Sequence, residues 1–310
     1  MPELPDVTVY VERLVALTAG TVLERVRLKS PFLLRSVQPA LSTTHGRSVR
    51  GVRRLGKRIV FELEGDLFLV LHLMIAGRLH WKAPGAALGG RISLAAFDFS
   101  AGTLVLTEAS SRKRASLYVV QGEAELALHD RGGLEPLGCT YAEFKARLSL
   151  ENRTLKRALT APHLFSGIGN AYSDEILHAA GLSPVTLTSR LTPAMIRKLH
   201  RATQGTLRRW TDTLRKESQG SFPEKVTAFR PDMAVHGKYL KPCPTCGTAV
   251  QRIRYAENEV NYCPRCQTEG RMLADRSLSR LLGADWPKTV DAWEEEHPVR
   301  EAPKPVDDAD

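Results

Sequence analysis

The spacing of hydrophobic residues divides the chain into regions of different secondary structure. Apolar residues between Val7 and Val15 recur three and four positions apart, which predicts a helix that begins near Pro5 and ends before Gly20. From about residue 21 to residue 120, short apolar or alternating runs lie between glycine-rich turns. The clearest runs are 66–74, 92–99 and 104–107. This part is interpreted as a β-sandwich or barrel-like domain with a helix at its beginning.

After about Gly122 the pattern becomes helical. Apolar residues again recur three and four apart in the segments 142–148, 155–159, 172–180 and 192–214. The last of these begins with Thr192 and Pro193, a capping residue followed by a proline at the first helical position. A separate module, from about residue 235 to residue 267, surrounds a cluster of cysteines.

The composition is that of an ordinary globular protein, with 43% hydrophobic and 25% charged residues. No apolar run approaches the roughly 20 residues that cross a bilayer, and the acidic start is not an export signal. Five cysteines are too few for a disulfide scaffold. We therefore expect a protein of the reducing cytoplasm, with no membrane partner.

The charge is positive and unevenly distributed. Lys and Arg outnumber Asp and Glu by 44 to 34, which gives a net charge of +10. Residues 190–282 hold 18 basic and 8 acidic residues, whereas residues 283–310 hold 3 basic and 9 acidic ones. The basic part favours a polyanionic partner such as nucleic acid. The acidic end, with three prolines between Pro298 and Pro305, is expected to be a flexible tail.

Four of the cysteines predict a metal site. Cys243 and Cys246 form one C-x-x-C pair, Cys263 and Cys266 form another, and 16 residues lie between the pairs. Two such pairs complete the tetrahedral S₄ shell that Zn²⁺ accepts, with a β-hairpin between them. Because protein fills all four positions, the one zinc ion is expected to be structural. A redox role of the C-x-x-C pairs is the less favoured alternative.

The amino terminus is a candidate nucleophile. Removal of Met1 would expose the secondary amine of Pro2, and an α-amino group is neutral at physiological pH far more often than a lysine is. Such an amine attacks an aldehyde-like carbon to form an iminium, and Glu3 stands beside it as a proton donor and acceptor. Taken alone, a Met-Pro start is common and carries little weight.

Three motifs together resemble the formamidopyrimidine-DNA glycosylase / endonuclease VIII family. They are the start Met1-Pro-Glu-Leu-Pro-Asp6, the segment Gly167-Ile-Gly-Asn-Ala-Tyr-Ser-Asp-Glu175 and the terminal pattern of cysteines. The resemblance implies an α+β multidomain fold: an N-terminal catalytic β-sandwich with flanking helices (2–121), a helix–two-turn–helix module (122–234), a zinc-ribbon β-hairpin (235–269) and a C-terminal extension (270–310). It also implies a monomer that binds damaged DNA, in duplex form, between its lobes.

The resemblance assigns roles to single residues. Pro2 is expected to form the Schiff base, Glu3 to act as general acid and base, and Lys57 to contact phosphate and assist catalysis. Lys156 falls where the family has a lysine near the lesion, Asn170 matches a phosphate-binding asparagine, and Glu175 matches an acidic residue of the same module. The glycine-rich turn before Asn170 exposes backbone N–H groups at a helix start, which suits a phosphate.

The chain departs from the family in two places. Where the family has a zinc-finger arginine, this chain has Asn258, and Arg252 or Arg254 is expected to compensate. The loop that usually carries an arginine and a phenylalanine holds Arg112 and Arg114 but no aromatic residue. In the family, a methionine also helps to fill the gap that the flipped base leaves in the duplex. Here that position is Ile75, which still offers an apolar side chain.

Three functional hypotheses follow. The first is a bifunctional DNA glycosylase and AP lyase for oxidised or ring-opened bases, which extrudes the damaged nucleotide because its C1′ cannot be reached in the stack. The second is a lyase or glycosylase acting mainly on abasic, single-stranded or crosslinked lesions, which the altered wedge favours. The third is a non-catalytic protein that binds damaged DNA; the amine beside a carboxylate argues against it.

Overall fold

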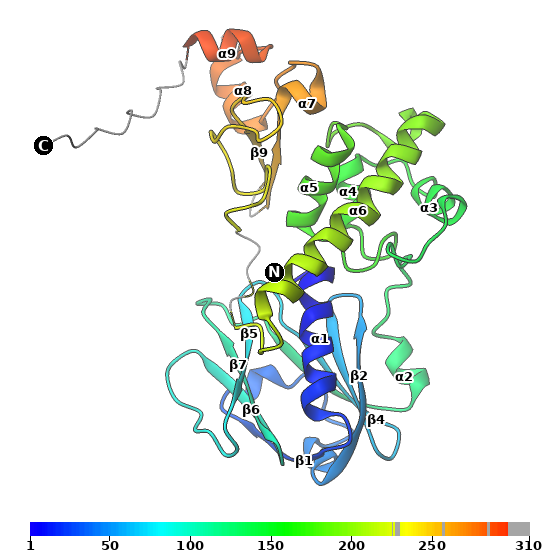
Figure 1. Ribbon diagram of the computed structural model, residues 1–310, viewed down its shortest axis with the longest axis vertical. Coiled ribbons are helices and arrows are strands. Elements are labelled where there is room, and N and C mark those ends of the chain that lie inside the picture. The colour runs from blue at the N-terminus through cyan, green and yellow to red at the C-terminus, as the bar shows by residue number, and fades with distance from the viewer. Residues whose placement is uncertain (225, 227–229, 256–257, 284–285, 297–310) are drawn as a thin grey trace, which may run out of the picture.

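The computed structural model of the 310-residue chain describes residues 1–224, 226, 230–255, 258–283 and 286–296. Figure 1 shows α1 and the strands in the lower part, the helices α3 to α6 above them, and β9 with α7, α8 and α9 at the top. The amino terminus lies where the lower and upper parts meet (Figure 1). Among the described residues, no helix combines the length and the apolar character that a membrane crossing requires.

The N-terminal region is one antiparallel sheet folded into two layers. It follows helix α1 (Leu4–Thr18), and its strands are β1 (Val22–Leu28), β2 (Arg47–Leu55), β3 (Arg58–Leu63), β4 (Leu67–His72), β5 (Gly77–Lys82), β6 (Ser93–Phe99), β7 (Gly102–Glu108) and β8 (Ser116–Gln121). The strand order is β5-β7-β6-β1-β2-β3-β4-β8. Only two residue pairs join β1 to β2, so the sheet turns there and its two halves face each other.

The two layers enclose one hydrophobic core, which confirms the predicted β-sandwich. Phe61 of β3 stacks against Phe97 and Phe99 of β6, with ring centroids 6.3 and 6.0 Å apart. The apolar face of α1, including Tyr10 and Leu14, belongs to the same core. The helix begins and ends where the hydrophobic spacing predicts.

The helical region packs around a second core. Its helices are α2 (Glu123–Ala127), α3 (Tyr141–Leu148), α4 (Leu155–Thr160), α5 (Asn170–Ala180) and α6 (Pro193–Ser218). As predicted, Thr192 caps α6: its hydroxyl accepts a hydrogen bond from the Met195 N–H at 3.3 Å. Leu4 of α1 is fully buried in this second core. The first turn of α1 therefore joins the lower and upper parts of the molecule.

The C-terminal region contains the predicted hairpin, β9 (Gln251–Tyr255) and β10 (Asn258–Tyr262), followed by α7 (Pro264–Thr268). Two further helices, α8 (Arg276–Leu282) and α9 (Val290–Glu296), were not predicted. The expectation of a flexible tail from residue 283 is wrong for its first part, because α9 is a helix and Val290 is fully buried. Residues 297–310 lie outside the described residues.

Candidate active site and zinc centre

The carboxylate of Glu3 is held by the amino-terminal end of α5. Its oxygens accept hydrogen bonds from the backbone N–H groups of Gly169 at 2.6 Å, Ala171 at 2.9 Å and Tyr172 at 3.2 Å. Glu3 is only 2% exposed. Three N–H donors at the positive end of the helix dipole hold the carboxylate in this position. Glu3 therefore occupies three N–H groups at this glycine-rich turn, and a phosphate contact at Asn170 stays a prediction.

Two glycines make this approach possible. A Cβ on Gly169 would lie 2.4 Å from Glu3 Cδ and 2.6 Å from Lys57 Nζ, so no other residue fits there without moving both side chains. Gly167 has φ +76°, and a Cβ on it would lie 2.8 Å from the Cβ of Leu4. The glycines of the second motif thus bring Glu3 and Lys57 to the same point.

Lys57 lies in the turn between β2 and β3 and lines a cavity of about 320 Å³ with Met1 and His72. Burial lowers the pKa of the Lys57 ammonium, and the charge of Glu3 opposes this shift. Burial also lowers the pKa of His72, to about 4, and the positive charges of Arg58 and Lys57 add to the effect. The cavity therefore combines a neutral imidazole with an amine that loses its proton more readily than a surface lysine.

Pro2 is buried directly before Glu3, and Met1 extends into the same cavity. Burial lowers the pKa of the Met1 amino group, partly opposed by Glu3. An amine at this place has a larger neutral, nucleophilic fraction than an exposed chain end. Pro2, Glu3 and Lys57 are thus brought together, as the sequence motifs led us to expect.

Asp6 is a member of this site that the sequence analysis missed. Its Oδ2 accepts a hydrogen bond from the Glu3 N–H at 2.8 Å, while its buried Oδ1 has no hydrogen-bond partner among the described residues. Burial raises the pKa of Asp6 to about 7. The only signal in the sequence is that Asp6 lies one helical turn after Glu3, at a spacing typical of capping residues.

Lys156 is buried in a polar network and does not face the active-site cavity. Its Nζ contacts Asp174 Oδ1 at 2.5 Å and donates to the Asn170 carbonyl at 2.6 Å. The other oxygen of Asp174 lies 2.8 Å from Nδ1 of His236, at the start of the C-terminal module. Lys156 is 7% exposed, and these contacts position α5. The placement of Lys156 near the lesion stays a prediction.

Asn170 and Glu175 join α5 to the C-terminal module. Asn170 Nδ2 donates to the carbonyl of Glu259 in β10 at 2.9 Å. Glu175 is 2% exposed, and its carboxylate accepts hydrogen bonds from the N–H groups of Ala234, Val235 and His236 at 2.9 to 3.0 Å. With three such donors, the Glu175 carboxylate holds this backbone segment against α5, and its assignment to DNA binding stays a prediction.

The four predicted cysteines form a metal site. The sulfur atoms of Cys243, Cys246, Cys263 and Cys266 all lie within 4.8 Å of one another. Zn–S bonds of about 2.3 Å in a tetrahedron place the sulfurs about 3.8 Å apart, and the Cys243–Cys266 and Cys246–Cys263 distances are 3.9 and 3.4 Å. The donor set fits one structural zinc ion. His178 of α5, not predicted, places Nε2 3.2 Å from Cys243 Sγ and orients this ligand.

The hairpin between the two cysteine pairs presents its arginines differently. Arg252 stacks over the ring of Tyr239, 4.1 Å from the centroid, and contacts Glu259 at 3.4 Å. The side chain of Arg254 is exposed, and its backbone N–H is held by Asp275. Asn258 pairs with Tyr255 at the end of the hairpin, and its side chain lies outside the described residues.

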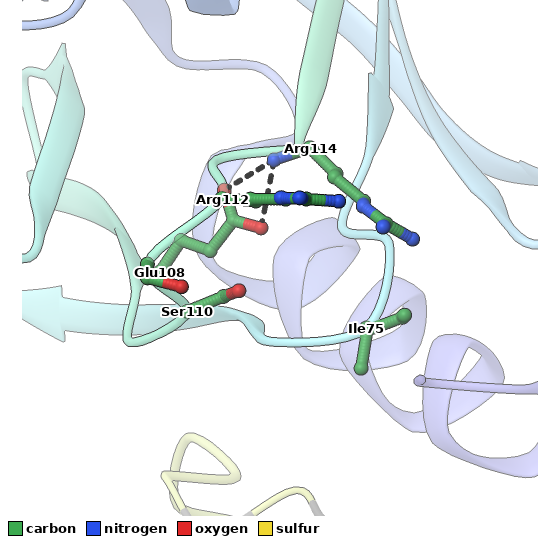
Figure 2. Close-up of a pocket in the computed structure, with 6 residues that line it drawn as sticks. Ile75, Glu108, Ser110, Arg112 and Arg114 are labelled. Carbon is green, nitrogen blue, oxygen red and sulfur yellow. Dashed lines mark hydrogen bonds between the residues drawn. The ribbon is translucent and has the colours of Figure 1, made fainter. Parts of the chain in front are cut away.

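The loop with Arg112 and Arg114, which differs from the family pattern, lines a second cavity of about 360 Å³ together with Ile75. Figure 2 shows Ile75 on one side, and Glu108, Ser110, Arg112 and Arg114 on the other. Ile75 is 51% exposed. The buried Glu108 carboxylate accepts hydrogen bonds from the backbone of Arg114 at 2.9 and 3.0 Å. Arg112 is exposed at the rim, and no side chain that lines this cavity is aromatic.

Known proteins match this chain along most of its length. Residues 1–119 match the formamidopyrimidine-DNA glycosylase N-terminal domain, residues 133–219 the H2TH domain of that protein, and residues 241–268 a zinc finger found in FPG and IleRS. The formamidopyrimidine-DNA glycosylase of Acidovorax sp. strain JS42 is 31% identical over 86% of this chain and 99% of its own. That of Thermus thermophilus is 33% identical over 87% and 100%.

Solved structures show the same fold. A Lactococcus lactis Fpg in complex with DNA containing an abasic site has a TM-score of 0.75 and 24% identity, and covers 86% of this chain and 99% of that one. The fold and site define a DNA repair glycosylase with a zinc finger. The chain belongs to the formamidopyrimidine-DNA glycosylase family, a family of bifunctional glycosylases and AP lyases.

Proposed function

We propose that this chain excises oxidised or ring-opened bases from duplex DNA through a Schiff base on Pro2, and then cleaves the strand as an AP lyase. The observation that carries the proposal is the meeting of the chain start, the clamped Glu3 carboxylate and Lys57 at Gly169. Relatives that bear the name formamidopyrimidine-DNA glycosylase support this choice of substrate.

The proposed reaction follows from the groups at this point. After Met1 is removed, the lone pair of the Pro2 nitrogen attacks C1′, the electrons of the glycosidic bond leave with the base, and the proton that the nitrogen loses goes to the departing base. Glu3 supplies a proton as the sugar ring opens to give an iminium at C1′. Removal of a C2′ proton then expels the 3′ phosphate by β-elimination. Lys57, with its lowered pKa, is placed to accept a proton or to stabilise the phosphate.

The experiment is reductive trapping of the imine. Borohydride added during turnover is expected to join the protein to a lesion-bearing oligonucleotide, and peptide mapping is expected to place the adduct on Pro2. A trapped adduct that maps to a residue other than Pro2 would refute the mechanism. Active protein whose intact mass still included Met1 would refute it equally.

A second candidate is a lyase or glycosylase for abasic, single-stranded or crosslinked lesions. The specific observation is the loop beside Ile75, whose cavity is lined by Arg112 and Arg114 and by no aromatic side chain. Without an aromatic side chain to stack there, the gap left by a flipped base is filled less well, which weakens the binding of duplex substrates. Substrates that have no opposite base lose less binding affinity. A panel of duplex and single-stranded oligonucleotides separates the two: cleavage of abasic DNA alone supports the second candidate, and binding without strand scission supports a non-catalytic protein.

The remaining expectations belong to the same proposal. They are a monomer of the bacterial cytoplasm, associated with the nucleoid through DNA, and a division at residues 121, 234 and 269. The relatives supply the partner: the Lactococcus lactis Fpg structures hold abasic or Fapy-dG DNA. Sedimentation of the free protein and of its DNA complex tests the monomer.

A further inference from the structure

The chain continues beyond the zinc finger in an ordered form. The zinc-finger match ends at residue 268, but the structure describes residues 269–283 and 286–296 as well, with helices α8 and α9. Residues 270–283 and 286–294 are called the clasp here. In Figure 1 the clasp lies directly against the hairpin module at the top of the molecule.

The clasp completes the small hydrophobic core of the hairpin. Leu273 is 7% exposed and packs in one cluster with Ile253 of β9 and with Val260 and Tyr262 of β10. Its N–H donates to the hydroxyl of Tyr262 at 2.8 Å. A two-stranded hairpin by itself is marginally stable in water, so this contact adds the apolar cover that the hairpin requires.

The clasp also covers the edge of β9. Asp275 is 2% exposed, and its Oδ2 accepts a hydrogen bond from the Arg254 N–H at 2.7 Å. Because β9 pairs with β10 on one side only, its other edge would otherwise present unpaired N–H groups. The carboxylate thus fixes the backbone of the residue whose guanidinium is exposed on this hairpin.

Backbone hydrogen bonds join the two parts of the clasp, and α9 contacts the segment that carries the second cysteine pair. The Val290 N–H donates to the Gly270 carbonyl at 2.7 Å, and the Met272 N–H donates to the Lys288 carbonyl at 2.9 Å. In α9, Asp291 and Glu294 contact the guanidinium of Arg265, which lies between two zinc ligands in the sequence, at 2.5 and 3.1 Å. These two contacts join α9 to the helix that carries the second cysteine pair.

We propose that the clasp is a positioning element for DNA binding, which holds the β9–β10 hairpin in its binding conformation before DNA arrives. The inference rests on the proposed function, because it takes the hairpin arginines as phosphate contacts. A hairpin that is ordered in advance binds without a further loss of conformational freedom. Loss of the clasp contacts is therefore expected to weaken DNA binding and to leave the chemical step unchanged.

The test uses the full chain with Asp275→Ala. We expect its Kd for duplex DNA with a non-cleavable abasic analogue to rise about tenfold, as for the loss of one charge-assisted hydrogen bond. The single-turnover rate at saturating DNA and a content of one zinc per chain are expected to stay as in the wild type. Amide exchange in residues 251–262 is expected to accelerate. Asp275→Asn, which keeps a carbonyl acceptor for the Arg254 N–H, should restore most of the affinity.

A second variant and a control keep the test decisive. The exposed pair Asp291→Asn and Glu294→Gln should raise Kd about two- to threefold, whereas Glu295→Gln, beside them on α9, should change nothing. An unchanged Kd in both Asp275→Ala and the double variant overturns the proposal, as does loss of zinc from Asp275→Ala. If the wild-type protein cleaves lesions and the clasp variants bind DNA normally, the positioning role of the clasp is refuted and the proposed function stands. If the wild-type protein binds no DNA, both the positioning role and the proposed function are refuted.

Discussion

Replacement of Gly169 by alanine is expected to slow turnover strongly while the fold stays intact. The added Cβ would lie 2.4 Å from Glu3 Cδ, 2.5 Å from Glu3 Oε1 and 2.6 Å from Lys57 Nζ. Carbon contacts begin at about 3.5 Å, so both side chains must move by about 1 Å. The backbone of Gly169 has φ −128°, which alanine adopts without strain, so the perturbation falls on the two side chains.

The expected size follows from that displacement. A shift of about 1 Å in a catalytic group costs on the order of 100-fold in rate. Crowding of a packed site costs about 1–3 kcal/mol of stability, which a domain of ordinary stability survives. The assay is single-turnover cleavage of a duplex oligonucleotide with an abasic site, with the yield of borohydride-trapped adduct measured in parallel and thermal unfolding as the check of the fold.

Gly205 provides the matched control. It lies in α6, and a Cβ there meets no atom within 4 Å. Gly205→Ala is expected to leave the rate unchanged and to raise stability by about 0.5–1 kcal/mol, because alanine favours the helix. If folded Gly169→Ala protein cleaved DNA within about threefold of the wild-type rate, the placement of Glu3 and Lys57 could not be what drives the reaction.

Three further outcomes are expected. Glu175→Ala leaves three backbone N–H groups without their acceptor, so we expect unfolding to become easier by about 3–5 kcal/mol and DNA affinity to fall; an unchanged urea midpoint would contradict this. Burial lowers the pKa of His72 to about 4, so below about pH 6.5 the unfolded chain binds a proton that the folded protein does not. The free energy of unfolding should then fall by up to about 3 kcal/mol as the pH drops from about 6.5 to about 4. Urea titrations at several pH values should show that this free energy depends less on pH in His72→Gln than in the wild type. An equal pH dependence in the two proteins would refute the assignment. A chelator that removes zinc from the four cysteines should weaken DNA binding and spare the β-sandwich, as followed by anisotropy and circular dichroism; unchanged affinity would exclude the hairpin as a DNA contact.

Local features of the sequence determined much of this protein. Periodicity placed α1, the strands β4, β6 and β7, and the helices α3 to α6, because each pattern reflects which side of a single element is buried. The spacing of the cysteine pairs predicted the zinc site, because two C-x-x-C turns define a tetrahedral ligand set by themselves. The family motifs identified Pro2, Glu3 and Lys57.

Only the tertiary structure decided which partners the polar side chains have. Glu3 and the N–H of Gly169 are 166 positions apart in the chain, and no periodicity predicts that this N–H donates a hydrogen bond to the Glu3 carboxylate. Lys156 and Glu175 are both buried in contacts that join α5 to its neighbours, and these partners cannot be predicted from the sequence. The clasp was missed because its contacts depend on Leu273 and Asp275 meeting a hairpin that forms elsewhere. The sequence gives the type of each side chain, whereas the groups that a buried charge contacts depend on how the elements pack.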